Sequence, residues 1–181
     1  MVIGICGFKG SGKSTVARHL VKEYGFRSLN FKGAIIAEII RKFPDVLDEL
    51  KRFYNAELHE LFETKPPIVR ALLQNYGTEV RRCDDENYWV DKWIERVNEE
   101  GERDIVTDDV RFFNELTAIK GMNGILIRVK RDDIATGGKH KTETEQESFH
   151  EDFTIEATKG NHESVYKQID SIIDTLKSNV D

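Results

Sequence analysis

The first 24 residues constrain the fold of this chain more than any other part of it. An apolar run, Val2–Cys6, leads into the segment 7–14, which reads GFKGSGKS, and helical periodicity begins directly afterwards at 14–24. A short apolar strand, a glycine-rich loop and an amphipathic helix, in this order, are typical of an α/β protein. We therefore expect a strand at 2–6 and a helix at 14–24.

The loop at 7–14 matches the pattern G-x-x-x-x-G-K-[ST], in which glycines let backbone N–H groups surround a polyphosphate. The N-terminus of the following helix adds partial positive charge. In this pattern Lys13 reaches the β- and γ-phosphates and Ser14 binds Mg²⁺. The sequence thus predicts nucleoside triphosphate binding, although kinases, GTPases and mechanical ATPases all use this loop. The expected nucleotide-binding residues are Gly7, Gly10, Ser11, Gly12, Lys13, Ser14 and Thr15.

Strands and helices alternate along the rest of the chain, which favours a parallel sheet covered on both faces. We expect further strands at 27–31, 104–107, 124–129 and 153–157, and helices at 34–43, 114–120 and 162–177. Between 46 and 98 the pattern is almost wholly helical, with breaks at 65–67 and 83–85, and predicts a helical insertion. The stretch 131–150 is polar and lacks apolar periodicity, as is usual for a functional or disordered loop.

Composition excludes several classes of protein. A chain of 181 residues fits one domain, and no apolar run approaches the roughly 18 residues of a membrane-spanning helix. No export signal is visible, so we expect a cytoplasmic protein. The net charge of −6 argues against general nucleic-acid binding, although residues 1–33 are basic. Cys6 and Cys83 have no neighbours that would make a zinc site, and we expect reduced or buried thiols.

Two carboxylates, Asp108 and Asp109, follow the expected strand at 104–107. A protein with a phosphate-binding loop places the acid that holds Mg²⁺ at this edge of the sheet, and either residue could serve. Arg111, two positions after Asp109, points the same way if the backbone is extended. The alternative is that the pair caps the helix at 114–120; the phosphate-binding loop favours the metal.

The expected helix at 68–82 carries two lines of side chains. One is apolar, and the other recurs at i, i+4, i+7 and i+11 as Arg70, Gln74, Gly77 and Arg81. A guanidinium binds phosphate, an amide pairs with a base edge, and a glycine lets a ligand approach. By pattern alone, a solvated face is the commoner explanation of this line, and we favour it on that ground.

Taken together, these segments resemble the bacteriophage deoxynucleoside monophosphate kinase family, within the P-loop nucleoside monophosphate kinases. The stretches that carry the resemblance, in the family's order, are 7–15, 70–82 followed by Trp89, 109–115 and, more weakly, 140–143. The resemblance implies a three-layer P-loop NTPase fold with about five parallel strands. It implies one domain over 1–181: a core at 1–33 and 102–181, a helical acceptor-binding insertion at about 34–101, and a mobile lid at about 131–150.

The resemblance also implies an activity: transfer of the γ-phosphoryl group from ATP to a deoxynucleotide 5′-phosphate, with Mg²⁺. Arg70, Gln74 and Thr78 would face the acceptor, Gln74 being the first candidate for base selection. Arg111 would lie at the phosphates. Arg128 and Arg131, which flank the start of the lid, could neutralise charge on the transferring group.

The chain departs from the family at 31–36, which reads FKGAII where the family often has Ala-Asp-Pro-Leu-Lys. Lys32 could replace the missing charge, but a surface lysine is the safer interpretation. For Tyr76, Tyr88 and Trp89, core packing is favoured over a wall against a 2′-hydroxyl. The acceptor is already a phosphate, so no catalytic histidine is needed, and we assign none of the five a chemical role.

Two alternatives stay open. One is another small-molecule kinase on the same scaffold, such as a phosphomevalonate or dephospho-coenzyme A kinase. The other is a nucleotide-dependent switch or a nucleic-acid-bound ATPase, although the Asn-Lys-x-Asp tetrad of a GTPase does not occur. The expected partners are ATP and a deoxynucleoside monophosphate, without nucleic acid or membrane. A homodimer is left open, and the compartment would be the host cytoplasm if a phage encodes the chain.

Overall fold

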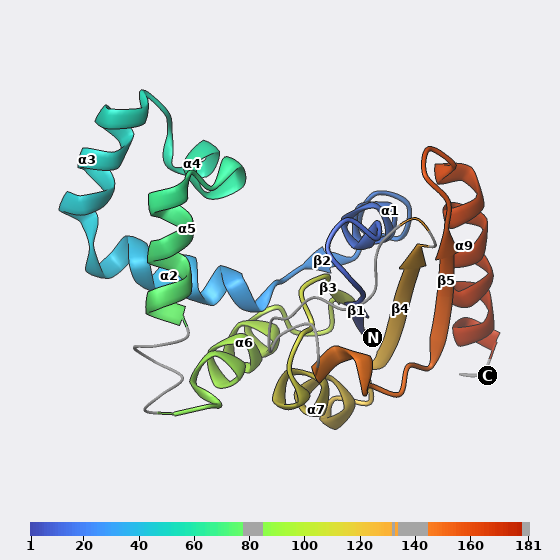
Figure 1. Ribbon diagram of the computed structural model, residues 1–181. Coiled ribbons are helices and arrows are strands. Elements are labelled where there is room, and N and C mark those ends of the chain that lie inside the picture. Colours follow the sequence, from blue (N-terminus) through green and yellow to red (C-terminus); the bar gives the residue numbers. More distant parts are fainter. Residues whose placement is uncertain (78–84, 132, 134–144, 179–181) are drawn as a thin grey trace. The chain divides into compact units, whose positions relative to one another are not determined.

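The computed structural model describes residues 1–77, 85–131, 133 and 145–178. They divide into two compact units, and Figure 1 shows the elements of both. The first comprises Met1–Asn30 and Arg96–Asp181, and the second comprises Phe31–Glu95. Each unit is described by itself.

The first unit is built on a five-stranded sheet. Its strands are β1 (Val2–Cys6), β2 (Arg27–Ser28), β3 (Ile105–Thr107), β4 (Ile125–Arg131) and β5 (Phe153–Ala157). They lie in the order β2-β3-β1-β4-β5, and every neighbouring pair is parallel. β1 therefore lies at the centre, paired with β3 on one side and β4 on the other. The carboxyl ends of β1 and β3 are neighbours, so the residues that follow these strands share one edge of the sheet.

Helices cover both faces of this sheet. α1 (Lys13–Tyr24) and α9 (His162–Ser178) share a buried cluster with Ile3 and Ile5 of β1. Gly4, which lies between these two isoleucines, faces the other way, toward Ile119 of α7 (Phe113–Gly121). Because side chains alternate along a strand, α7 covers the face opposite α1 and α9. The three-layer α/β prediction is thus confirmed (Figure 1).

A polar link joins the two helices on the first face. Asp170 of α9 accepts a hydrogen bond from the Tyr24 hydroxyl at 2.7 Å, and its carboxylate pairs with His19 Nε2 of α1, also at 2.7 Å. The His19 ring stacks on Tyr166 with centroids 4.3 Å apart. Packing between α1 and α9 thus explains the position of the His19 ring.

The second unit is helical. It contains α2 (Phe31–Lys42), α3 (Pro44–Tyr54), α4 (Leu58–Thr64), α5 (Pro67–Gln74) and most of α6 (Tyr88–Glu99). Proline occupies the first turn of α3 and of α5, where its missing N–H costs nothing. The predicted break at 65–67 is confirmed, because α4 ends at Thr64 and α5 starts at Pro67. The other predicted break, at 83–85, lies mostly outside the described residues.

Aromatic residues form much of the core of this unit. Trp89 is fully buried, and its indole N–H donates to the Gly77 carbonyl at 2.8 Å. The hydroxyls of Tyr76 and Tyr88 both donate to Glu38, at 2.6 Å each. The preference for core packing at these aromatic residues is therefore confirmed. Glu38 itself, a buried carboxylate that also pairs with Lys42, was not anticipated from the sequence.

Gly77 does not lie on an exposed helix face that a ligand could reach. Residues 75–77 form a π-helical turn, which breaks the regular i, i+4, i+7 line of α5. Gly77 is buried, and a Cβ at this position would lie 2.9 Å from Ile35 Cδ1. The glycine thus lets α2 pack closely and is unavailable to a ligand.

The start of the second unit also differs from the sequence prediction. The strand expected at 27–31 is confined to Arg27–Ser28, and α2 begins at Phe31 instead of 34. Phe31 is buried and its ring lies 4.5 Å from that of Trp93, so packing draws this residue into the helix. No helix within the described ranges is long and apolar enough to span a bilayer.

Candidate active site

The loop between β1 and α1 has a backbone that favours glycine. Gly7, Gly10 and Gly12 have φ values of 141°, 84° and 106°. At Gly7 space is restricted as well, because a Cβ would lie 2.4 Å from the Val129 carbonyl oxygen and 2.9 Å from Ser11 Oγ. The glycines of the motif are therefore needed for the loop to curl at the start of α1.

Lys13 lies folded across this loop. Its ammonium group donates to the carbonyl oxygens of Gly7, at 2.7 Å, and Phe8, at 2.8 Å. Burial, and next the positive charge of Arg111, lower the pKa of Lys13, while Asp108 acts in the opposite direction. Two cations held close together are costly unless an anion joins them, so this arrangement favours a polyphosphate.

The two carboxylates after β3 have different environments. Asp108 Oδ2 accepts a hydrogen bond from the Ser14 hydroxyl at 2.6 Å. The fold thus brings together Ser14 and Asp108, both of which are predicted to bind the metal. Asp109 is buried and accepts from the Thr107 hydroxyl at 2.9 Å. Its carboxyl thus faces the strand end, whereas that of Asp108 faces α1.

The N-cap position of α7 is Phe112, three residues after the acidic pair. Glu115 Oε2 accepts the backbone N–H groups of Arg111, at 2.7 Å, and Phe112, at 3.1 Å. Glu115 therefore caps α7 from within its own first turn. This leaves Asp108 available at the phosphate-binding loop.

Arg131 is brought to the same loop from the end of β4. Its Nη1 donates to the Gly10 carbonyl at 2.7 Å, and its Nε pairs with Asp133 at 2.5 Å. The guanidinium is thus oriented beside the loop that carries Lys13. Most of the expected lid, residues 132 and 134–144, lies outside the described residues.

Arg128 has a different environment. It is buried, and Nη2 donates to the carbonyl oxygens of Gln146, at 2.8 Å, and Phe149, at 3.0 Å, while Nε pairs with Glu151 at 2.8 Å. Its hydrogen-bonding capacity is directed at the segment 146–151. We therefore assign Arg128 to holding this segment on β4, and leave it out of the catalytic group proposed below.

The Arg128–Glu151 pair gives a pH-dependent prediction. Burial is the largest single effect and opposes ionisation of Glu151, but the hydrogen bonds from Arg128 and the backbone, together with the charges of Arg128 and Lys130, outweigh it and lower the pKa of this carboxyl. Its stabilising effect is therefore fully present above the unfolded pKa, near 4.5, and is lost as pH falls through the folded value. We expect Glu151→Gln to lower Tm by roughly 2–6 °C at pH 7, and the difference from wild type to shrink below about pH 4.5.

Differential scanning fluorimetry at pH 7, 5.5 and 4 tests this expectation. The matched control is Glu163→Gln, because Glu163 is an exposed residue of α9 whose ion pair with Lys167 is also exposed. A Tm difference for Glu151→Gln that is unchanged across these pH values would contradict the assignment.

The expected acceptor-binding residues belong to the second unit. Arg70 and Gln74 are exposed and one turn apart on α5. Lys32 lies in the first turn of α2. Thr78 lies outside the described residues. The first unit therefore collects the residues expected to bind the nucleotide with Asp108, Asp109, Arg111 and Arg131, and the second carries those expected to bind the acceptor.

The sequence prediction missed a group of residues near the end of the long polar stretch 131–150. Residues 145–147 form one helical turn, in which Gln146 is buried and its Oε1 accepts the Gly7 N–H at 3.2 Å. Glu145 Oε2 accepts the N–H of Phe113, the first residue of α7, at 3.3 Å. Nothing in the local pattern distinguishes these residues from a solvated acidic loop, so only tertiary structure could identify them.

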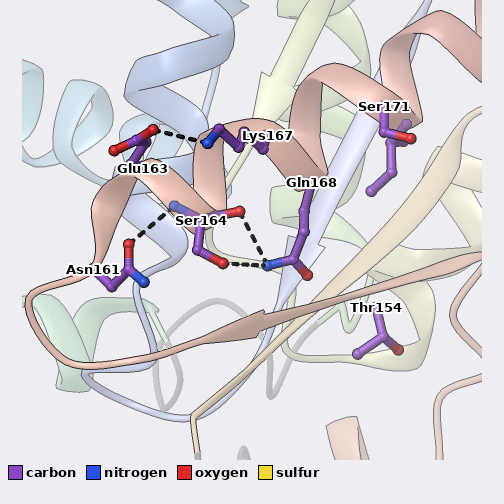
Figure 2. Close-up of a pocket in the computed structure, with 8 residues that line it drawn as sticks. Thr154, Asn161, Glu163, Ser164, Lys167, Gln168 and Ser171 are labelled. Atoms are coloured by element: carbon purple, nitrogen blue, oxygen red, sulfur yellow. Dashed lines mark hydrogen bonds and ion pairs between the residues drawn. The ribbon is translucent and has the colours of Figure 1, made fainter.

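A separate hollow lies between β5 and α9 and is not this site. Figure 2 shows that several of its polar side chains bond to one another or to nearby backbone. Lys167 pairs with Glu163 at 2.8 Å, and Asn161 accepts the N–H of Ser164 at 3.1 Å. The Gln168 amide also binds both the N–H and the C=O of Glu156 on the edge strand. None of the predicted site residues lines this hollow.

The geometry around the loop fits a bound nucleotide with Mg²⁺. Ser11 Oγ is buried and has no hydrogen-bond partner among the described residues. Nowhere in the described ranges do three His, Cys, Asp or Glu side chains group as a metal site. Mg²⁺ is commonly held by one or two carboxylates together with substrate phosphates, which is what the Ser14–Asp108 pair offers.

Comparisons with known proteins give consistent results. A family model described as deoxynucleotide monophosphate kinase matches residues 48–169. A protein of Acanthamoeba polyphaga mimivirus named "Putative deoxynucleotide monophosphate kinase" is 28% identical over 96% of this chain and 96% of its own length. A cytidylate kinase of Thermococcus kodakarensis is 29% identical over 46% of this chain and 38% of its own length.

Solved structures are similar at low identity. TT1252 from Thermus thermophilus shares 19% identity over 97% of both chains, with a TM-score of 0.51. Dephospho-CoA kinase from Campylobacter jejuni shares 16% identity over 98% of both chains, with a TM-score of 0.49. The likeness to TT1252 concerns the fold alone.

Proposed function

Because this chain belongs to the deoxynucleotide monophosphate kinase family, we propose that it transfers the γ-phosphoryl group of ATP to the 5′-phosphate of a deoxynucleoside monophosphate. The products would be ADP and a deoxynucleoside diphosphate. The observation that carries the proposal is the hydrogen bond that joins Ser14 of the phosphate-binding loop, next to Lys13, with Asp108 after β3, in a chain that this family model matches.

Phosphoryl transfer needs alignment of the reacting oxygens and neutralisation of charge, and little covalent chemistry from the protein. Lys13 and Arg111 supply two positive charges at the loop, and Arg131 supplies a third beside Gly10. The acceptor is a phosphate that needs no strong general base. The residues of this site therefore act by orienting and neutralising the phosphates.

We propose ATP as the phosphate donor and Mg²⁺ as the metal. When bound, Mg²⁺ would offset the negative charge of the nucleotide phosphates. Ser14 and Asp108 are the residues that would hold it. Asp109, buried against Thr107, would support the strand end that presents Asp108.

Acceptor binding is assigned to Arg70, Gln74, Thr78 and Lys32 of the helical insertion. Arg70 and Gln74 are exposed on α5 and offer forked donors and an amide, which suit a phosphate and a base edge. The cytidylate kinase relative makes cytidine nucleotides the first acceptors to test. The lid predicted at about 131–150 stays part of this proposal for the residues before 145, because the segment 146–151 is held on β4 by Arg128.

The acceptor assignment predicts a selective effect of Arg70→Ala. Loss of one guanidinium–phosphate contact should raise the acceptor KM about tenfold and leave the KM for ATP within about twofold. Steady-state kinetics with each substrate varied in turn measure both values. Arg52→Ala, an exposed arginine of α3 in the same unit, is the control and should change neither KM. Equal effects of Arg70→Ala on both KM values would exclude Arg70 from the acceptor site.

A further inference from the structure

Gln146 connects two segments that are far apart in the sequence. Its side chain is only 4% exposed, and Oε1 accepts the N–H of Gly7, which precedes it by 139 positions. Gly7 is the first residue of the phosphate-binding loop. The buried side-chain amide of Gln146 therefore contacts the phosphate-binding loop directly.

Gly7 in turn holds Lys13. Its carbonyl oxygen accepts a hydrogen bond from Lys13 Nζ at 2.7 Å. Gly7 also lies close to β4 and has no room for a side chain, since a Cβ on it would lie 2.4 Å from the Val129 oxygen. The N–H held by Gln146 and the carbonyl that holds Lys13 flank the same α-carbon. Rotation about that carbon would displace the ammonium group.

The turn that carries Gln146 is fixed from several directions. Arg128 donates to the Gln146 carbonyl oxygen at 2.8 Å and pairs with Glu151 beyond it. Glu145 accepts the N–H of Phe113 at the start of α7, and the ring of Phe149 packs 5.0 Å from that of Phe113. Gln146 is thus presented to Gly7 from a rigid support.

We propose that Gln146 is a positioning residue for nucleotide binding and phosphoryl transfer. Its side-chain oxygen fixes the Gly7 peptide, and the Gly7 carbonyl then sets the place of the Lys13 ammonium group. The inference rests on the proposed function, because it is there that Lys13 binds the phosphates. Gln146 itself touches no reacting atom.

Three variants separate this role from a merely structural one. Gln146→Met keeps the length and bulk of the side chain but removes the acceptor, whereas Gln146→Glu retains an acceptor oxygen. Glu147→Gln changes an exposed neighbour on the same turn and serves as the control. Calorimetric titration with MgATP, thermal unfolding and steady-state kinetics are measured on the full chain for each.

We expect Gln146→Met to weaken MgATP binding about five- to tenfold and to lower kcat about tenfold, with the acceptor KM within twofold. Gln146→Glu should recover most of the MgATP affinity, and Glu147→Gln should match wild type. If Gln146→Met is folded and binds MgATP as wild type does, the proposal is wrong, whatever its Tm.

The calorimetric readout keeps this proposal separate from the proposed function. Absence of acceptor-dependent turnover in the wild type, with the affinity pattern intact, would overturn the kinase proposal and support the role of Gln146 in nucleotide binding. Normal turnover together with unchanged affinity in Gln146→Met would overturn only the inference about Gln146.

Discussion

Lys13→Ala is expected to lower kcat by at least about 10²–10³-fold while the protein stays folded. The ammonium group is a half-buried cation of the phosphate-binding loop, and it donates hydrogen bonds to the carbonyls of Gly7 and Phe8. In the transition state the charge on the transferring group would lose its closest positive partner. Initial rates at saturating ATP and acceptor, with circular dichroism of the same samples, measure the two expectations.

Lys22→Ala is the matched control for this variant. Lys22 lies on the same helix, and its side chain is exposed and paired with Glu23. We expect its kinetics to equal those of wild type. Turnover of Lys13→Ala within about tenfold of wild type would contradict the role of the loop in transfer.

The second large effect is expected for Asp108→Asn. This substitution keeps the size of the side chain and a partner for the Ser14 hydroxyl, but removes the negative charge that would hold Mg²⁺. We expect kcat to fall about 10²-fold at fixed Mg²⁺ and the Mg²⁺ concentration for half-maximal rate to rise about tenfold. Titration of the rate with MgCl₂ at saturating ATP measures both.

Asp109→Asn separates the two adjacent carboxylates. Asp109 is buried and bonded to Thr107, so we expect its substitution to lower Tm while the Mg²⁺ dependence stays close to that of wild type. The reverse pattern, with the Mg²⁺ requirement altered by Asp109→Asn and not by Asp108→Asn, would move the metal-binding role to Asp109.

Much of the first unit could be predicted because its signals are local. The apolar run at 2–6, the glycines of 7–14 and the periodicity of α1 lie next to one another in the chain. The strand expected at 153–157 is β5 with the same bounds, since alternating residues and flanking polar segments mark it clearly. Asp108 could be proposed from the sequence for the same reason, as it follows an apolar strand; its metal-binding role stays a prediction.

The features that were missed depend on contacts between distant segments. Gln146 lies in a polar, acidic stretch, and only the fold brings it to Gly7. Arg128 looked like a lid residue by its position, but its place on β4 directs it to the segment 146–151. Gly77 would lie in line with Arg70 and Gln74 if the helix were regular, but the π turn at 75–77 moves it out of that line.

The most direct test of the kinase proposal is a coupled ADP-release assay with MgATP and a panel of acceptors. The panel contains the four deoxynucleoside monophosphates, the ribonucleoside monophosphates, modified dCMPs, phosphomevalonate and dephospho-coenzyme A. We predict ADP release that depends on one or more deoxynucleoside monophosphates and forms the diphosphate in equal amount. ADP release independent of any acceptor, or dependent only on phosphomevalonate or dephospho-coenzyme A, would contradict the proposed function.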